Sequence, residues 1–195
     1  MTANRYHGAR ARRYEMARRN QGKWKFEKHN FKRVLKLLGD EVENVIDAPI
    51  GTGMFLEFYN TPVRGYDISQ DMLDMAALKE SGAVLKVLDI VKKPIYAKAS
   101  LVVCIRFLNL VSWKDATMTL KHLLAASKKY ILFTMRTVPV GFKGAMNVGR
   151  VFLHKNSDLM DLLKEKGFYV TGRYSHLDTV PGSFDMILAK RIDAE

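Results

Sequence analysis

Three carboxylates that close apolar runs, together with a glycine turn, are the residues of this sequence best suited to binding chemistry. Asp47 ends one run and is followed by Gly51 and Gly53, which let the backbone approach a ligand closely. Asp67 ends a second run 20 residues beyond Asp47, and a carboxylate there can accept hydrogen bonds from both hydroxyls of a ribose. Asp89 ends a third run, where we expect it to face an adenine amino group. The pattern predicts a nucleoside site.

The glycine turn discriminates between the nucleotides that such a site can hold. A dinucleotide site uses Gly-x-Gly-x-x-Gly, with the pyrophosphate at a helix N-terminus. Residues 51–56 read GTGMFL, so the third small residue is missing, and Asp47 would set a negative charge near the pyrophosphate. The Gly-Lys-Ser/Thr of a P-loop does not occur. The same acid suits a ligand that carries an ammonium and a sulfonium, and S-adenosylmethionine carries both, with a ribose and an adenine.

Strands that alternate with helices must position these residues. Apolar runs bounded by turn residues predict strands at 43–48, 63–68, 83–90, 100–107, 130–135, 168–177 and 183–191. Helical spacing and cap residues predict helices at 24–38, 53–59, 69–80, 113–127 and 156–167. A long irregular segment, 136–155, contains three glycines, and a loop of that length in a compact domain usually has a function or moves.

This alternation predicts an α/β fold, in which helices cover both faces of a mostly parallel sheet. The seven expected strands and the turn at Pro181-Gly182 indicate a doubly wound, Rossmann-like sheet whose last strand is antiparallel. Ligands of such open sheets bind outside the carboxyl ends of the strands, where the three carboxylates are expected.

The net charge of +12 over 195 residues is concentrated at the N-terminus. Residues 1–38 hold 12 Lys and Arg against two Glu, whereas the remainder is nearly neutral. We therefore expect a basic N-terminal helical segment at 1–38 and a ligand-binding domain at 39–195. Two interpretations of the basic segment stay open: it contacts nucleic acid through phosphates, or it is a solvated helix that folds over the active site. The arginines of the first interpretation are Arg10, Arg12, Arg13, Arg18 and Arg19.

Composition excludes several classes of protein. The single cysteine, Cys104, cannot form an internal disulfide, and a reducing cytoplasm is the expected setting. A structural zinc site needs more Cys and His at short spacing, and no metal is expected. No run is long and apolar enough to span a bilayer, and the Arg-rich start has no apolar segment of a secretory signal.

The chain resembles the class I S-adenosylmethionine-dependent methyltransferases over residues 30–191. Their first motif is acid-x-Gly-x-Gly-x-Gly, and Pro49 stands here at the first glycine. Small ubiquinone/menaquinone-methyltransferase-like proteins similarly carry Asp-x-Pro-x-Gly-Thr-Gly. Their segments also resemble Tyr14-Glu15-x-x-Arg18 with Trp24, Asp67-Ile68-Ser69 with Met72-Leu73, and Arg106-Phe107-Leu108-Asn109.

The resemblance implies a methyltransferase that uses S-adenosylmethionine, with Asp47, Gly51 and Gly53 at the methionine moiety, Asp67 at the ribose and Asp89 at the adenine. The other cofactor-binding candidates are Ala48, Pro49, Ile68, Met72, Ile90 and Arg106. The substrate-binding candidates are Tyr14, Arg18 and Trp24. We expect the segment 136–155 and the N-terminal segment to form the acceptor pocket.

No residue stands out as catalytic. His154 and Arg106 are candidates, the first as a general base and the second as a partner of an anionic acceptor, and His176 is a further possible base. Cys104 lies inside an apolar run and lacks the preceding Pro of cytosine-C5 methyltransferases. The Pro-Pro-aromatic motif of amino-group DNA methyltransferases is also missing.

Three functions therefore remain. The favoured one is methyl transfer to a small molecule. The alternatives are methylation of a nucleic acid, and a protein that binds or cleaves S-adenosylmethionine and contacts nucleic acid through its basic N-terminal segment.

Overall fold

A computed structural model describes residues 9–19, 21–79, 82–144, 146–178 and 180–192, and the side chains of 9–12 are not described. The helices are α1 (Ala9–Arg19), α2 (Gly22–Leu38), α3 (Gln70–Ala77), α4 (Trp113–Ala126) and α5 (Asn156–Glu165). The strands are β1 (Val45–Asp47), β2 (Val63–Asp67), β3 (Val84–Val87), β4 (Ala99–Cys104), β5 (Ser127–Val138), β6 (Asn147–Val148), β7 (Val151–Phe152), β8 (His154–Lys155), β9 (Phe168–His176) and β10 (Ser183–Arg191). Short 3-10 helices cover Gly39–Glu41, Leu56–Phe58 and Leu108–Leu110.

The main sheet has the strand order β3-β2-β1-β4-β5-β10-β9, and β8 pairs with the end of β5. The pairs from β3 to β5 are parallel, and β10 pairs antiparallel with both β5 and β9. The predicted Rossmann-like fold is therefore confirmed. The antiparallel strand is last in the chain but lies inside the sheet, and β8 is an additional two-residue strand.

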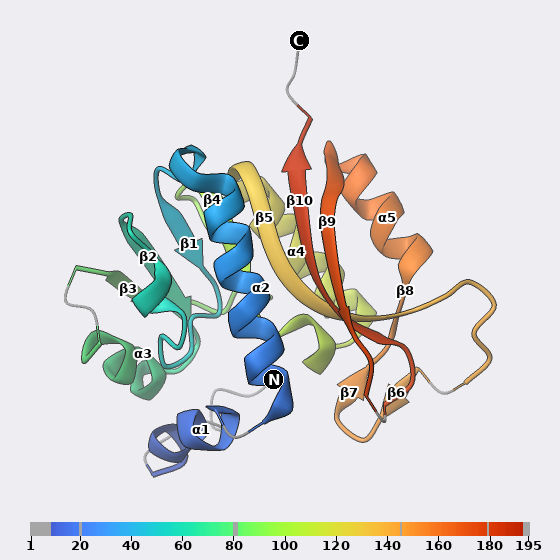
Figure 1. Ribbon diagram of the computed structural model, residues 1–195, viewed down its shortest axis with the longest axis horizontal. Coiled ribbons are helices and arrows are strands. Elements are labelled where there is room, and N and C mark those ends of the chain that lie inside the picture. The colour runs from blue at the N-terminus through green and yellow to red at the C-terminus, as the bar shows by residue number, and fades with distance from the viewer. Residues whose placement is uncertain (1–8, 20, 80–81, 145, 179, 193–195) are drawn as a thin grey trace.

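Helices cover both faces of the sheet, with α2 in front and α4 behind in the view of Figure 1. Alternate residues of each central strand serve opposite faces, as the two-residue repeat of a strand requires. Ile46, Val102 and Ile131 pack with α4 and α5, whereas Val45, Leu101 and Leu132 pack with α2 and α3. Cys104 is fully buried in β4, and burial raises the pKa of its thiol.

Cap residues fix the ends of the helices next to the site. Gly39 ends α2 with a φ of +48°, and α2 buries Trp24, Phe31, Val34 and Leu38. Ser69 caps α3 by accepting a hydrogen bond from the backbone N–H of Met72. No helix among the described residues is long and apolar enough to cross a membrane.

Two expected elements differ from the structure. The prediction of a helix at 53–59 is wrong, because the chain there forms turns and the 3-10 helix Leu56–Phe58. Phe55 and Phe58 pack on Phe31 of α2, with ring centroids 4.4 and 6.2 Å away, and β2 begins soon after, at Val63. The segment 136–155 is less irregular than expected, because β5 continues to Val138 and β6, β7 and β8 lie within it.

Candidate functional site

One cavity lies at the carboxyl ends of β1, β2 and β4. The N-terminal helices α1 and α2 close one side of it, through Tyr14 and Trp24. It holds about 870 Å³ of empty space, counting its open mouth. The residues that line it are Tyr14, Trp24, Asp47, Pro49, Ile50, Gly51, Thr52, Met54, Phe55, Asp67, Ile68, Met72, Ile105, Arg106, Phe107 and Leu110. The cavity is therefore mostly apolar, with two carboxylates and one guanidinium.

The two glycines of the turn after β1 have different roles. Gly51 lines the cavity with a φ of +57°, and nothing lies within 4 Å of the position that a Cβ would take. Gly53, with a φ of +69°, lies outside the lining, and a Cβ there would meet the Leu56 side chain at 2.5 Å and Ala76 at 3.1 Å. Gly51 thus opens the cavity, whereas Gly53 allows the turn to pack on α3.

Asp67 is held in place by backbone groups. Its Oδ2 accepts a hydrogen bond from the N–H of Gly51 and its Oδ1 accepts one from the N–H of Ser69, both at 2.9 Å. Burial raises the pKa of Asp67, although hydrogen bonds from the backbone N–H groups of Ser69, Gly51 and Ile68 oppose this rise. A carboxylate offers about four lone-pair sites, so this fixed side chain can also accept a hydrogen bond from a diol.

Asp47 is buried at the end of β1, where the hydroxyl of Tyr59 donates a hydrogen bond to its Oδ2 at 2.9 Å. Burial raises its pKa to about 7, the Tyr59 hydrogen bond opposes the rise, and the charge of Asp67 adds to it. A cation in the cavity would stabilise the ionised form of Asp47.

The structure brings many of the predicted residues together at this cavity. Of the cofactor candidates, Asp47, Pro49, Gly51, Asp67, Ile68, Met72 and Arg106 line it; of the substrate candidates, Tyr14 and Trp24 line it. Ala48 and Ile90 lie in the hydrophobic core against α4. Asp89 is partly exposed, accepts from the N–H of Val91 at 3.1 Å and pairs with Lys92 at 3.7 Å. Arg18 stacks over the Tyr14 ring at 4.9 Å and does not line the cavity.

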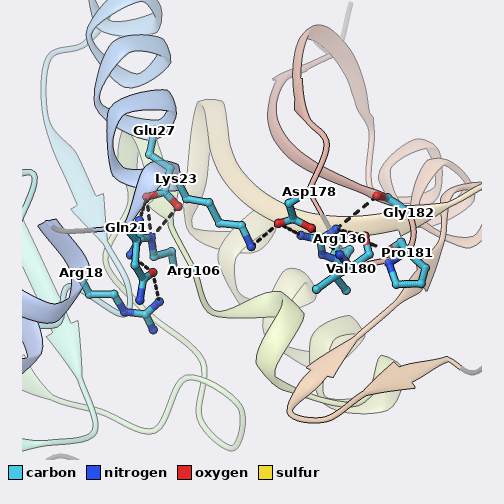
Figure 2. Close-up of polar contacts among 10 residues, drawn as sticks. All are labelled: Arg18, Gln21, Lys23, Glu27, Arg106, Arg136, Asp178, Val180, Pro181 and Gly182. Carbon is cyan, nitrogen blue, oxygen red and sulfur yellow. Dashed lines mark hydrogen bonds and ion pairs between the residues drawn. The ribbon is translucent and has the colours of Figure 1, made fainter.

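Arg106 forms an ion pair with Glu27 of α2, and both side chains are almost fully buried (Figure 2). Its Nε donates to Oε1 of Glu27 at 2.7 Å. Burial raises the pKa of Glu27, while Arg106, Arg18 and Lys23 act to lower it. The pair attaches α2 to the loop after β4 and fixes the guanidinium at the edge of the cavity.

The two histidine candidates lie away from the cavity. His154 is buried in β8, its Nε2 is 2.9 Å from the carbonyl oxygen of Leu108, and its ring packs on Trp113. Burial lowers the pKa of His154. His176, at the end of β9, packs its ring against Phe26 at 5.2 Å. A role of either histidine as a general base stays a prediction.

The expected acceptor loop does not line the cavity either. None of the lining residues belongs to 136–155. The β6–β7 hairpin extends away from α1 in Figure 1, and β7 contacts the 3-10 helix Leu108–Leu110 instead. Residues 105–110, which follow β4, form that side of the cavity.

Helix α1 is attached to the body by Glu15, which belongs to the motif Tyr14-Glu15-x-x-Arg18 but to which the sequence alone assigns no role. Glu15 pairs with Lys79 beyond α3 and with Arg19, and Thr52 in the glycine turn donates to it at 3.4 Å. Although burial acts to raise it, Lys79 and Arg19 hold the pKa of Glu15 below its ordinary value. These contacts hold Tyr14 against the cavity.

The other residues that sequence reasoning missed are Tyr59, Glu27 and the apolar lining of Ile50, Met54, Phe55, Ile105 and Leu110. An acid inside an otherwise apolar helix face signals Glu27, because a buried charge requires a partner. Nothing in the spacing of Tyr59 signals its contact with Asp47.

Comparisons with known proteins agree with the fold. No protein-family model matches the chain, and no curated protein matches it in sequence. The chain is similar to magnesium protoporphyrin IX methyltransferase from Synechocystis PCC 6803 with bound SAH: TM-score 0.68, 17% identity, 84% of this chain and 81% of that chain covered.

Two other solved structures are similar over nearly the whole chain. An S-adenosylmethionine-dependent methyltransferase from Clostridium acetobutylicum has a TM-score of 0.68 at 14% identity, and covers 93% of this chain and 96% of its own. The complex of DhpI with SAM and HEP has a TM-score of 0.67 at 15% identity, and covers 94% of this chain and 92% of its own. The chain has the fold of S-adenosylmethionine-dependent methyltransferases. Membership of the ubiquinone/menaquinone-methyltransferase-like subgroup stays a prediction.

Proposed function

We propose that this protein binds S-adenosylmethionine in the cavity between Asp47 and Asp67 and transfers its methyl group to a small-molecule acceptor. Asp67 would hold the ribose hydroxyls, and Asp47 the ammonium of the methionine moiety. The bound cofactor would supply an electrophilic methyl group. The observation that carries the proposal is the pair of buried carboxylates on either side of the Gly51 turn, one of them fixed by backbone N–H groups.

The turn after β1 also argues against a dinucleotide. Residues 48–62 form turns and the 3-10 helix Leu56–Phe58, so no α-helix begins at the glycine turn. The N-terminus of such a helix is what stabilises a pyrophosphate in dinucleotide-binding folds. Buried Asp47, beside this turn, would repel a phosphate and attract a cation.

Calorimetry with the intact protein tests the cofactor assignment. We expect SAM and S-adenosylhomocysteine (SAH) to bind, and NAD to bind far more weakly. Methyl transfer from radiolabelled SAM to a small-molecule extract tests the activity. Binding of NAD in preference to SAH would contradict the proposal, and release of methylthioadenosine from SAM without methyl transfer would favour the cleaving alternative.

A nucleic-acid acceptor is the second candidate, favoured by the outward face of α2. Lys25, Lys32, Arg33 and Lys36 are all exposed there, and Arg13 and Arg19 are exposed on α1. We propose the small molecule first, because Tyr14 and Trp24 close the cavity from the side of these helices, which leaves little room for a polymer.

A further inference from the structure

The cavity supplies no evident general base. Among the described residues that line it, the ionisable ones are Tyr14, Asp47, Asp67 and Arg106, and none is a histidine, lysine or cysteine. Asp47 accepts a hydrogen bond from Tyr59, and Asp67 accepts hydrogen bonds from backbone N–H groups. In the proposed function both carboxylates hold the cofactor. In the part of the chain that the structure describes, the cavity therefore leaves no free side chain to remove a proton from the nucleophilic atom of an acceptor.

The edge of the cavity next to α2 is instead rich in cations. Arg18 and Arg106 both direct an NH1 group at the side-chain oxygen of Gln21, each at 3.4 Å (Figure 2). That oxygen is neutral, and both contacts are longer than the distances of about 2.7–2.9 Å at which guanidinium groups bond carboxylates. Two guanidinium groups thus share one weak acceptor.

The surrounding charges leave this place positive. Lys23 and Arg136 lie on the far side of Glu27 and share the carboxylate of Asp178, at 2.6 and 2.7 Å (Figure 2). Four basic side chains therefore face two carboxylates, Glu27 and Asp178. Glu27 pairs with Arg106, and Asp178 is shared by Lys23 and Arg136, so one positive charge is in excess in each pair. The pair formed by Arg18 and Arg106 therefore keeps a net positive charge at the edge of the cavity.

The backbone of Arg106 is also unusual. Its φ of +59° is the only positive φ of a non-glycine residue in the described part of the chain. Such a conformation costs free energy in an L-residue, and it tends to occur where a side chain must be aimed at a ligand. Its backbone N–H donates to Thr134 Oγ1 at 2.6 Å, which helps to hold it in that conformation.

We propose that the methyl acceptor is an oxyanion, a carboxylate or a phosphate-type group, which binds between Arg18 and Arg106 in place of the Gln21 amide oxygen. The proposal rests on the proposed methyl transfer and narrows its substrate class. A lone pair of the anionic oxygen forms the new bond to the methyl carbon, while the methyl–sulfur bond breaks and its electron pair stays on sulfur. The oxygen carries no proton, so the step needs no base.

Binding of matched probes to the SAH-saturated protein tests the site. Benzoate represents a carboxylate, methylphosphonate a phosphate-type group, and benzamide a neutral molecule with the shape of benzoate. We expect benzoate, methylphosphonate or both to bind at constant ionic strength, and benzamide to bind at least about tenfold more weakly, since hydrogen bonds to a charged group are worth more. The two anions distinguish the sources of the oxyanion.

Gln21→Glu is the decisive variant, because it puts a permanent carboxylate where the acceptor is expected. It should weaken binding of the anionic probe about tenfold or more, while SAH affinity stays within about twofold. Arg18→Gln should weaken the same probe. Arg33→Gln, which removes an exposed α2 charge that lies over Tyr174, is the control for net charge and should change neither. Arg106 itself is left intact, because its loss would leave Glu27 buried without a partner.

Three outcomes overturn the inference: benzamide binds as tightly as the anions, neither anion binds the SAH complex, or Gln21→Glu weakens the anion no more than Arg33→Gln does. If SAH itself does not bind the wild-type protein, the proposed function fails instead. A screen of acceptors with radiolabelled SAM completes the test, with acids expected to be methylated and their amides not.

Discussion

The hydroxyl of Tyr59 donates a 2.9 Å hydrogen bond to Oδ2 of Asp47 at the bottom of the cavity. The Tyr59 ring packs edge-on against Phe31 of α2, with ring centroids 5.6 Å apart, so the phenol is fixed from the far side. Burial and the charge of Asp47 raise the pKa of Tyr59 well above its ordinary value, so the phenol stays a donor. It stabilises the ionised form of Asp47, whose pKa burial raises to about 7.

We expect Tyr59→Phe to weaken SAH binding about tenfold at pH 7, because a hydrogen bond to a charged group is worth roughly 1.5–3 kcal/mol. Wild-type affinity should fall as the pH falls through about 7, since protonated Asp47 cannot pair with an ammonium. The variant should show this fall at higher pH. Calorimetry between pH 5.5 and 9 measures it. 5′-Methylthioadenosine, which lacks the ammonium, is the control, and equal losses for both ligands would contradict the role of Tyr59.

Asp47→Asn should stabilise the ligand-free protein in alkaline solution. The pKa of Asp47 is about 7 in the folded protein and near 3.8 in the unfolded protein. Between these pH values the folded state binds one more proton than the unfolded state, so stability falls as the pH rises. The variant does not lose stability in this way. Its free energy of unfolding should exceed that of the wild-type protein by up to about 4 kcal/mol at pH 8, and this difference should disappear near pH 4. Urea unfolding at both pH values measures the difference. A constant difference would mean that Asp47 does not titrate in this range.

Asp67→Ala should weaken SAH binding about tenfold or more, because it removes the carboxylate that would accept hydrogen bonds from the ribose. It also leaves the N–H groups of Gly51 and Ser69 without this hydrogen-bond acceptor. The Asp67→Ala substitution should weaken the binding of adenosine to the same extent. It should change the affinity for 2′,3′-dideoxyadenosine little, because that analogue lacks both hydroxyls. Asp74→Ala, on the exposed face of α3, is the matched control. An equal effect on the dideoxy analogue would remove the ribose assignment.

Glu15→Gln should loosen α1, because the carboxylate carries the contacts with Lys79, Arg19 and Thr52. We expect faster hydrogen exchange over 9–19 and faster SAH dissociation. The carboxylate has a lowered pKa, so its stabilising effect is present above its ordinary pKa and is lost as the pH falls through the folded value. Wild-type α1 should therefore exchange faster at low pH, after correction for the intrinsic rate. Unchanged exchange in the variant would show that other contacts hold α1.

A salt titration separates the two interpretations of the basic N-terminal segment. If it binds RNA or DNA, affinity must fall steeply with salt, because neutralised phosphates release counterions. Deletion of residues 1–19 would then remove most of that dependence and spare SAH binding. We expect the opposite: weakened SAH binding, because Tyr14 is lost from the cavity, and little RNA affinity at physiological salt. Filter binding and calorimetry on both proteins measure this.

The sequence predicted the frame of the site because local signals specify it. The runs before Asp47 and Asp67, the positive-φ glycines and the Ser69 cap are all local, and they fix where β1, β2 and α3 begin and end. The fold class follows from their order. Asp89 does not line the cavity: its carboxylate accepts a hydrogen bond in its own turn, because a strand-end acid can be satisfied locally. Its contact with an adenine stays a prediction.

Contacts between distant segments could not be predicted. Glu27 and Arg106 are 79 residues apart, and Tyr59 lies in a segment whose composition resembled a helix. Phe55 and Tyr59 of that segment pack on Phe31 of α2 instead. No residue spacing within the segment predicts this packing. The extension of β5 to Val138 is likewise fixed by pairing with other segments, with β10 as far as Thr137 and with β8 at Thr137 and Val138.

The burial of Cys104 has a practical consequence for spectroscopy. It is the only cysteine of the chain, it is fully buried, and its thiol keeps its proton. Because the thiolate is the reactive form, this residue should resist maleimide and nitroxide reagents in the folded protein. A cysteine introduced on the exposed face of α1, at Met16, would then be the one site that accepts a probe. The native chain is thus a ready background for attaching a single fluorophore or spin label.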